Sequence, residues 1–214
     1  MTPIVDGEVL KFEPTGVYNG LLLLSDTKTR SFWNHITGEC VYGHYKGRTL
    51  EINNLLHTTL EAALEDYDNI KIAISKQPIH VKIINSLMKF IQNINKDFMP
   101  PSFKNTMEEE DNRLDRMDTG LGIWNENKSK FYRYEDIENN DSVIVDEFDG
   151  KKIIIYIDKT SSMPVCRYII GEVYKWENKE IRLLDGKILD EMPMQLLTRW
   201  YGFSLTFKNC EIYR

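Results

Sequence analysis

The chain lacks any apolar segment long enough to cross a membrane. Its apolar runs, such as Leu21–Leu24, are far shorter than the roughly 20 residues that span a bilayer. It also lacks an excess of positive charge, because 27 Lys and Arg residues stand against 33 Asp and Glu residues, a net charge of −6. Proteins that coat nucleic acids need a net basic face. We therefore expect neither a membrane nor a nucleic acid among the partners.

Cysteine is scarce. Cys40, Cys166 and Cys210 form an odd, widely spaced set, unlike a secreted disulfide framework or a zinc knuckle. Residues 1–7 have neither the basic start nor the apolar stretch of a signal peptide. We therefore expect a cytoplasmic protein, and we assign no metal-ligand set.

The signatures of common enzymes are absent as well. The chain contains no Gly-x-Ser-x-Gly, phosphate-binding loop, dinucleotide fingerprint or His-Glu-x-x-His. The sequence therefore leaves the cofactor unknown and does not decide whether the protein is an enzyme. It also leaves monomer and homodimer open.

Short strands dominate the pattern that is present. Hydrophobic residues make up 42% of the 214 residues, so the chain can bury a large core without disulfides or a structural metal. The run Leu21–Leu24 is expected to be a strand buried on both faces. Strands are predicted where apolar runs lie between turn residues, at 9–12, 16–25, 30–33, 48–52, 71–75, 120–124, 130–134, 142–148, 151–157, 165–170 and 210–213.

Three helices are predicted among these strands. One covers 60–66, after the capping residues Thr58 and Thr59. The clearest covers Pro78–Asn95, where apolar side chains recur at three- and four-residue steps on one face. A last helix is predicted over 194–201.

The segment 102–118 follows Pro100 and Pro101 and is strongly acidic. Proline cannot continue a helical hydrogen-bond ladder, so we interpret this segment as an exposed connection. Its carboxylates offer an alternative, a site for a hard cation such as Mg²⁺ or Ca²⁺. The spacing of a calcium loop is missing, and we therefore favour a solvated linker.

Landmarks of the first third recur in the last third at a nearly constant spacing. Asp6-Gly7 is as far from Asp149-Gly150 as Trp33 is from Trp176. We therefore predict an α+β, β-rich fold in one compact domain, 1–214, made of two related β-rich repeats with short helices. The copies cover 5–75 and 148–214, and the insertion 76–147 carries the amphipathic helix. Further pairs in the same order are Gly47 and Gly186, Leu50 and Leu189, Thr58 and Thr198, Asn69 and Asn209, and Ile72 and Ile212.

A seam between two repeats is a typical place for a ligand cleft. The most polar segment of the chain brings His35, Glu39 and Cys40 close together in sequence. A His–Cys pair supports nucleophilic catalysis, with Glu39 orienting the imidazole. Alternatively, His35, Glu39 or Cys40, and the distant His57 ligate a metal. The simplest interpretation is a hairpin in which Trp33 packs inward and His35 bonds a turn carbonyl.

Polar and aromatic residues elsewhere suggest ligand contacts. Asn19-Gly20, a pair that like Asp6-Gly7 predicts a tight turn, precedes the leucine run, and Arg199 lies beside two aromatic residues that can clamp an anionic ligand. The leading hypothesis is a binding module for an unknown small molecule or protein. The alternative is a small hydrolase-like or metal-assisted enzyme that uses His35, Glu39 and Cys40 at the repeat seam. The candidate ligand-binding residues are Asn19, Trp33, Asn34, His57 and Arg199.

Several motifs together carry a family resemblance. They include Gly16–Leu23, Asp26–Gly43 with its Trp-Asn-His-Ile-Thr-Gly-Glu-Cys segment, Thr106–Arg113 and Gly120–Trp124. The match continues through Gly47–Leu50, Phe148–Gly150 and Trp200–Phe203. In these motifs the chain resembles the prokaryotic family catalogued as domain of unknown function 3179.

The resemblance covers nearly the whole chain. It implies kinship rather than an activity, because the family has no established activity. Many members resemble one another in a Cys-Pro-x-x-Thr-Gly-like segment just before the position of Val5. This chain starts after that segment, so the resemblance implies no thiol or metal role for it here.

Overall fold

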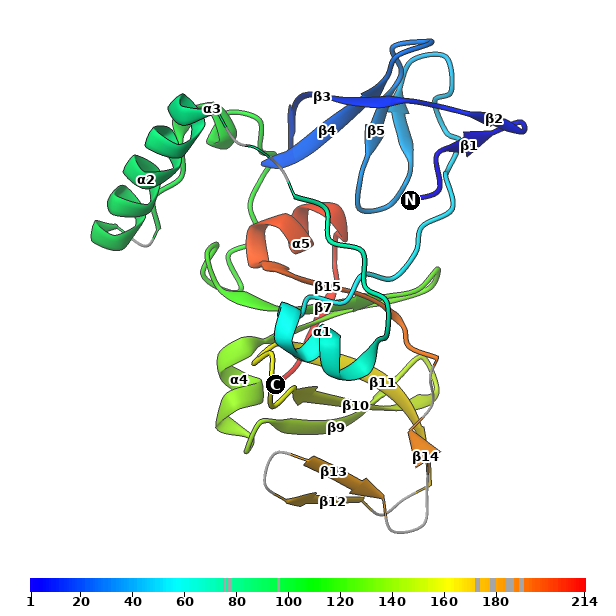
Figure 1. Ribbon diagram of the computed structural model, residues 1–214, viewed down its shortest axis with the longest axis vertical. Helices are drawn as coiled ribbons and strands as arrows, with labels where there is room; N and C mark the ends of the chain where they lie inside the picture. Colours follow the sequence, from blue (N-terminus) through cyan, green and yellow to red (C-terminus); the bar gives the residue numbers. More distant parts are fainter. Residues whose placement is uncertain are drawn as a thin grey trace.

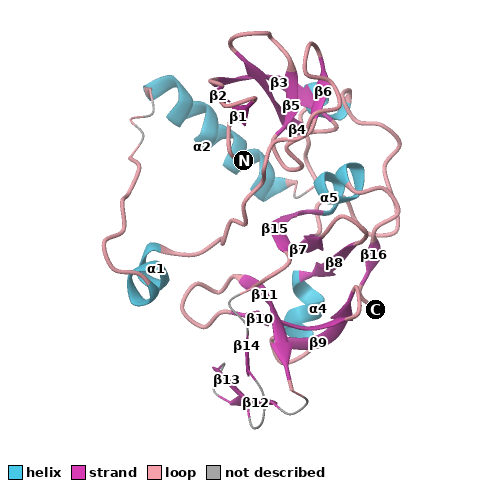
Figure 2. Ribbon diagram, turned by 90° about the vertical axis from the view of Figure 1, so that its right-hand side faces the viewer, coloured by secondary structure: helices cyan, strands magenta, loops and turns pink. Residues whose placement is uncertain are grey.

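The computed structural model describes residues 1–74, 76, 78–95, 97–171, 174–177, 180–183, 187–188 and 191–214. Within these ranges, mainly antiparallel sheets form most of the molecule and short helices lie between and beside them, an α+β arrangement (Figure 1). The N-terminal sheet lies at one end of the molecule. The helix α5 (Trp200–Thr206) lies between it and the remaining sheets (Figure 2).

The N-terminal sheet is built from hairpins. A small hairpin of β1 (Ile4–Val5) and β2 (Glu8–Val9) precedes it. Two-residue hairpin turns favour positive φ angles at both positions. Asp6-Gly7 has 51° and 80°, and Asn19-Gly20 has 50° and 69°, so the turn expected at each pair is confirmed. The sheet itself follows chain order as β3 (Phe12–Tyr18), β4 (Leu21–Asp26), β5 (Phe32–Asn34) and β6 (Cys40–Tyr42).

Trp33 lies at the centre of the core of this sheet. It is fully buried, as is Cys40, and Leu10 and Leu50 pack into the same cluster. The expectation that the leucine run is buried on both faces is wrong, because Leu22 is 45% exposed. An antiparallel sheet at the edge of a molecule turns one face to solvent.

A central sheet follows, in the order β15 (Met194–Arg199), β7 (Thr119–Trp124), β8 (Ser129–Arg133) and β16 (Glu211–Ile212). β16 runs parallel to β8, and the other pairs are antiparallel. α5 packs against β7 through Phe203, which is 1% exposed. A Cβ atom on Gly122 would lie 2.1 Å from the Phe203 ring, so glycine is what allows the helix this close.

The third sheet has the order β14 (Lys187–Ile188), β11 (Pro164–Ile170), β10 (Lys151–Ile157) and β9 (Val143–Phe148). The helix α4 (Tyr134–Asn139) buries Ile137 against Ile153 and Ile155 of β10. A separate hairpin pairs β12 (Tyr174–Glu177) with β13 (Glu180–Leu183).

The remaining helices are α1 (Leu60–Asp66), α2 (Ile79–Ile94) and α3 (Pro101–Lys104). The Thr59 hydroxyl accepts the N–H of Ala62 at 3.2 Å, which confirms the predicted cap of α1. The limits of α2 agree with the predicted limits within one residue, and the helix stands apart from the sheets in Figure 1. Among the described helices, none combines the length and the apolar character that crossing a bilayer requires.

Several predicted elements differ in the structure. The predicted strand 16–25 is instead the end of β3 and most of β4, joined by the Asn19-Gly20 turn, and residues 10–11 of the predicted strand 9–12 lie in no strand. Residues 194–199 form the strand β15 instead of a helix, and the helix begins at Trp200. β15 pairs with β7 along its whole length, and this pairing outweighs the local helical pattern. Residues 71–74 pair with no described strand, and 48–52 contributes one isolated bridge, between Thr49 and Glu39.

The predicted duplication stays a prediction. Asp6-Gly7 and Asp149-Gly150 both occupy hairpin turns. Trp33 lies in the four-stranded N-terminal sheet, whereas the backbone of Trp176 belongs to β12, which pairs with β13. The predicted insertion supplies β7 and β8, the middle of the central sheet. The predicted landmarks Gly186 and Leu189 lie outside the described residues.

Candidate functional site

A pocket of about 420 Å³ opens where the β3–β4 turn approaches the C-terminal end of α5. Stretches that are far apart in the sequence form its wall. We call it the Asn19 pocket. It is lined by Tyr18, Asn19, Leu21, Asn34, Thr37, Glu39, Val41, Glu108, Leu205, Thr206 and Lys208.

Asn19 joins the hairpin to the chain segment that ends at Glu108. Its side-chain Oδ1 accepts the N–H of Glu108 at 3.1 Å, and its own N–H donates to the Thr106 carbonyl oxygen at 3.0 Å. The N–H of Gly20 donates to the Thr106 hydroxyl at 3.2 Å. Asn19 is 5% exposed and takes the left-handed conformation that asparagine tolerates. This predicted ligand residue therefore also holds the pocket wall together.

Glu108 carries the first carboxylate of the pocket. Lys208 Nζ donates to Glu108 Oε2, and the Tyr18 hydroxyl donates to Oε1 at 3.3 Å. The hydrogen bond from Lys208 lowers the pKa of Glu108. Burial and the nearby Glu108 charge raise the pKa of Tyr18. At neutral pH the charges of Glu108 and Lys208 therefore cancel, and Tyr18 remains a neutral donor.

Glu39 carries the second carboxylate, and it is exposed. Its main chain is fixed, because its N–H donates to the Thr37 hydroxyl at 3.3 Å and its carbonyl oxygen accepts the Asn34 N–H at 2.8 Å. No side chain in the described ranges donates to the Glu39 carboxylate. Asn34 Oδ1 accepts the N–H groups of Ile36 and Thr37, so its amide nitrogen is left to donate. The pocket thus offers one free acceptor beside one free donor.

The predicted catalytic residues are not brought together. His35 Nδ1 bonds the Leu22 carbonyl oxygen at 2.7 Å, which belongs to the strand β4 and not to a turn as the simplest interpretation expected. Cys40 is fully buried, its Sγ donates to the Tyr42 carbonyl oxygen at 3.3 Å, and burial raises the pKa of the thiol. Within the described part of the chain, no hydrogen bond joins His35 to Glu39 or Cys40. A reactive thiol needs access and a lowered pKa, and Cys40 has neither.

The other predicted ligand residues lie in different places. Asn19 and Asn34 line the Asn19 pocket. His57 is exposed in the irregular segment before α1. Arg199 ends β15, where its Nη1 donates to the Met117 carbonyl oxygen at 2.9 Å.

Trp33 is not available to a ligand, because it belongs to a buried polar centre around Asp26. Asp26 is 0% exposed and accepts the N–H groups of Lys28, Thr29 and Ser31 and the indole N–H of Trp33, the last at 3.2 Å. Burial acts to raise the pKa of Asp26, but these hydrogen bonds, that from the Thr29 main chain foremost, bring it below its ordinary value. Asp26 therefore holds the β4–β5 connection as a buried, ionised group.

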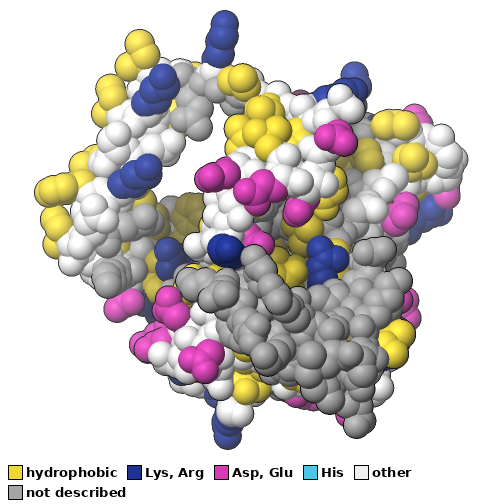
Figure 3. Space-filling model, turned by 60° about the horizontal axis from the view of Figure 1, so that its bottom comes forward, with side chains coloured by type: hydrophobic (Ala, Val, Ile, Leu, Met, Phe, Trp, Pro, Cys, Tyr) yellow, Lys and Arg dark blue, Asp and Glu magenta, His cyan; other side chains and the backbone are white. Residues whose placement is uncertain are grey.

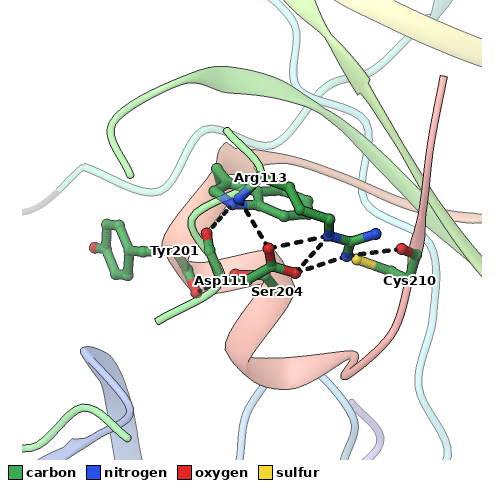
Figure 4. A network of polar contacts seen from close by, with 6 residues as sticks. Asp111, Arg113, Tyr201, Ser204 and Cys210 are labelled. Atoms are coloured by element: carbon green, nitrogen blue, oxygen red, sulfur yellow. Dashed lines mark hydrogen bonds and ion pairs between the residues drawn. The ribbon is translucent and has the colours of Figure 1, made fainter. Parts of the chain in front are cut away.

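The acidic connection is also more ordered than a solvated linker. Arg113 donates to both carboxylate oxygens of Asp111, with Nη2 to Oδ2 at 2.6 Å, and to the Cys210 carbonyl oxygen at 3.0 Å (Figure 4). The indole N–H of Trp200 donates to the Asp111 carbonyl oxygen at 2.7 Å. The prediction of an exposed connection is therefore wrong around Asp111, which ties this segment to α5 and to the C-terminal end.

Cations of the protein itself neutralise two further carboxylates of this segment. Glu108 pairs with Lys208, and Glu110 pairs with Arg116 at 2.8 Å. Among the described residues, no group of three or more His, Cys, Asp or Glu side chains is arranged to hold a metal ion.

The model of the family described as protein of unknown function DUF3179 matches residues 2–188, most of the chain. The chain belongs to this family, as the resemblance implied. No curated protein and no solved structure matches it. Of the pocket residues, those from Tyr18 to Glu108 lie within the matched region, whereas Leu205, Thr206 and Lys208 lie beyond it.

Sequence reasoning missed Glu108 and Lys208 as pocket residues. They are 100 residues apart, and the pair forms because the end of α5 returns to the N-terminal hairpin. No local spacing in the sequence links these two residues. The nearest signal is the Asn19-Gly20 pair, which predicts a turn with a polar side chain just before a strand.

Proposed function

We propose that the protein is a binding module for a small polar amine, held in the Asn19 pocket. One observation carries this proposal. The Glu39 carboxylate is free in a pocket whose other carboxylate, Glu108, is already neutralised by Lys208. A hydrogen bond between an ammonium group and a carboxylate is among the stronger polar contacts in proteins. The free charge therefore favours a ligand with one ammonium group.

The rest of the wall suits the polar part of such a ligand. The Asn34 amide donates to oxygen acceptors, and Leu21, Val41 and Leu205 supply apolar surface. A few convergent polar groups on a partly apolar wall are typical of small-molecule sites. Amino sugars and amino acids combine an ammonium group with oxygen acceptors, and we favour these two classes.

The alternative is a hydrolase-like or metal-assisted enzyme built on His35, Glu39 and Cys40, and the geometry favours it less. Glu39 lines the pocket, but its neighbour Cys40 packs in the core, since adjacent residues of a strand point to opposite faces. His35 is engaged by a main-chain carbonyl. None of these contacts prepares a nucleophile.

Calorimetric titration of the purified chain tests the proposal. The ligands are amino sugars and amino acids, each paired with the neutral sugar or carboxylic acid that lacks the amine. We expect the amines to bind and their partners without the amine not to. Glu39→Gln keeps the shape but removes the charge, and we expect it to weaken amine binding about 10- to 100-fold.

Glu109→Gln is the matched control. Glu109 is an exposed carboxylate beside Glu108 that does not line the pocket. We expect this variant to bind like the wild type. Unchanged binding in Glu39→Gln, equal losses in both variants, or no heat from any amine would contradict the proposal.

We also propose that the chain contains two related copies and that the protein is cytoplasmic. α1 and α5 each have 7 residues and occupy matching positions in the two predicted copies. Asn69 and Asn209, which also match, both have a φ of 62°. These correspondences support two related copies. Cys40, Cys166 and Cys210 are all free and buried, which supports a reducing compartment.

A further inference from the structure

The helix α2 presents an apolar face that is open to solvent among the described residues. Val81, Met88 and Ile91 of this face are half-buried, but six large side chains are more than half exposed. In a helix packed on a core, such a stripe would be buried. The side chains are Ile79 (78%), Ile83 (63%), Ile84 (56%), Leu87 (57%), Phe90 (62%) and Ile94 (72%).

The segment that carries this helix is positively charged, although the protein as a whole is not. The chain has a net charge of −6, yet no Asp or Glu occurs between Asp68 and Asp97. Positive charge is therefore concentrated where the apolar face is exposed. The lysines of this segment are Lys71, Lys76, Lys82, Lys89 and Lys96.

The lysines of the helix lie on its polar side, away from the apolar face. Lys82 and Lys89 are both exposed, and their spacing of two helical turns places them on one side. Figure 3 shows hydrophobic side chains along the outer edge of the arm at the left, where α2 lies, with Lys or Arg side chains beside them. A helix with a wide apolar face and lysines on its polar side is typical of segments that lie in a membrane interface.

We propose that α2 binds the surface of an anionic membrane. Its apolar face enters the headgroup region, and Lys82 and Lys89 contact lipid phosphates. Such binding needs no spanning segment, so it replaces our expectation that the protein has no membrane partner. A second copy of the chain fits this face less well, because two lysine-rich segments of like charge would meet. The proposal does not depend on the Asn19 pocket.

Co-sedimentation of the full chain with lipid vesicles tests the proposal. One set of vesicles is phosphatidylcholine alone, and the other is an equal mixture with phosphatidylglycerol. We expect at least about tenfold tighter binding to the anionic set, which weakens as salt is added. Replacing both lysines, Lys82→Gln with Lys89→Gln, should weaken that binding about 30-fold. Replacing Leu87 and Phe90 by Ser should abolish it.

The control is Lys11→Gln with Lys46→Gln, which makes the same charge change at exposed lysines outside α2. We expect this control to bind like the wild type. All variants should keep the unfolding transition of the wild type, since each replaced side chain is exposed. Equal binding to both vesicle sets, equal losses in the control, or no sedimentation would overturn the proposal. A further result would also overturn it: the wild type forms a dimer and does not bind vesicles, and replacing Leu87 and Phe90 by Ser dissociates that dimer.

Discussion

Replacing Asp26 by Asn should destabilise the N-terminal sheet strongly. Asp26 is fully buried, and each of its oxygens accepts two main-chain or indole N–H groups, from Lys28 and Thr29 on one side and from Ser31 and Trp33 on the other. An amide replaces one oxygen by an NH₂ donor. Whichever way the amide turns, two N–H groups therefore lose their acceptor.

The size of the effect follows from those two lost bonds. A hydrogen bond to a charged group contributes about 1.5–3 kcal/mol, so we expect Asp26→Asn to lower the free energy of unfolding by about 3–6 kcal/mol at pH 7. The pKa of Asp26 is lowered in the folded state, so its contribution is present at neutral pH and is lost as the solution becomes acidic. The difference between wild type and variant should therefore shrink below about pH 4.

Urea denaturation followed by tryptophan fluorescence measures this difference. Asp149→Asn is the matched control, because Asp149 is an exposed turn residue that accepts the side-chain amides of Asn125 and Asn127. Its left-handed conformation suits asparagine, so this variant should stay close to the wild type. A loss below about 1 kcal/mol in Asp26→Asn, or equal losses in both variants, would refute the reasoning.

Three further predictions concern packing, thiols and the pocket wall. Gly122→Ala should lower the midpoint of thermal unfolding, at a cost of about 1–3 kcal/mol, because its new Cβ would meet the Phe203 ring; an unchanged midpoint would contradict this packing. The three cysteines should all resist Ellman's reagent at pH 8 until the protein is unfolded, since all are buried and burial raises the pKa of Cys210 to about 11. Rapid labelling of the native protein would contradict this burial. Asn19→Gly keeps the left-handed turn but removes the acceptor of the Glu108 N–H. The free energy of unfolding measured in urea should therefore fall by about 1 kcal/mol, and amine binding should weaken. Unchanged stability and unchanged binding would mean that Asn19 does not hold the pocket wall.

Local chemistry explains the features that the sequence predicted correctly. The Asn19-Gly20 turn depends on residues that tolerate positive φ angles, and the residue types alone indicate this tolerance. The limits of α2 follow from Pro78 and from apolar residues at helical spacing.

Long-range pairing explains the failures. Residues 194–199 were predicted to be helical, but as β15 they pair with β7, from the middle of the chain. The Asn19 pocket depends on the ion pair between Glu108 and Lys208, and no local sequence pattern predicts this pair. The helix α2 is a different case. The sequence predicted this amphipathic helix correctly, but most of its apolar side chains are exposed in the structure.

A crystal structure of the chain with the amine that binds most tightly tests the central claim most directly. We expect the ammonium group within hydrogen-bond distance of the Glu39 carboxylate, with the ligand inside the Asn19 pocket and the Glu108–Lys208 pair intact. A ligand bound elsewhere, or one whose ammonium group faces away from Glu39, would contradict it.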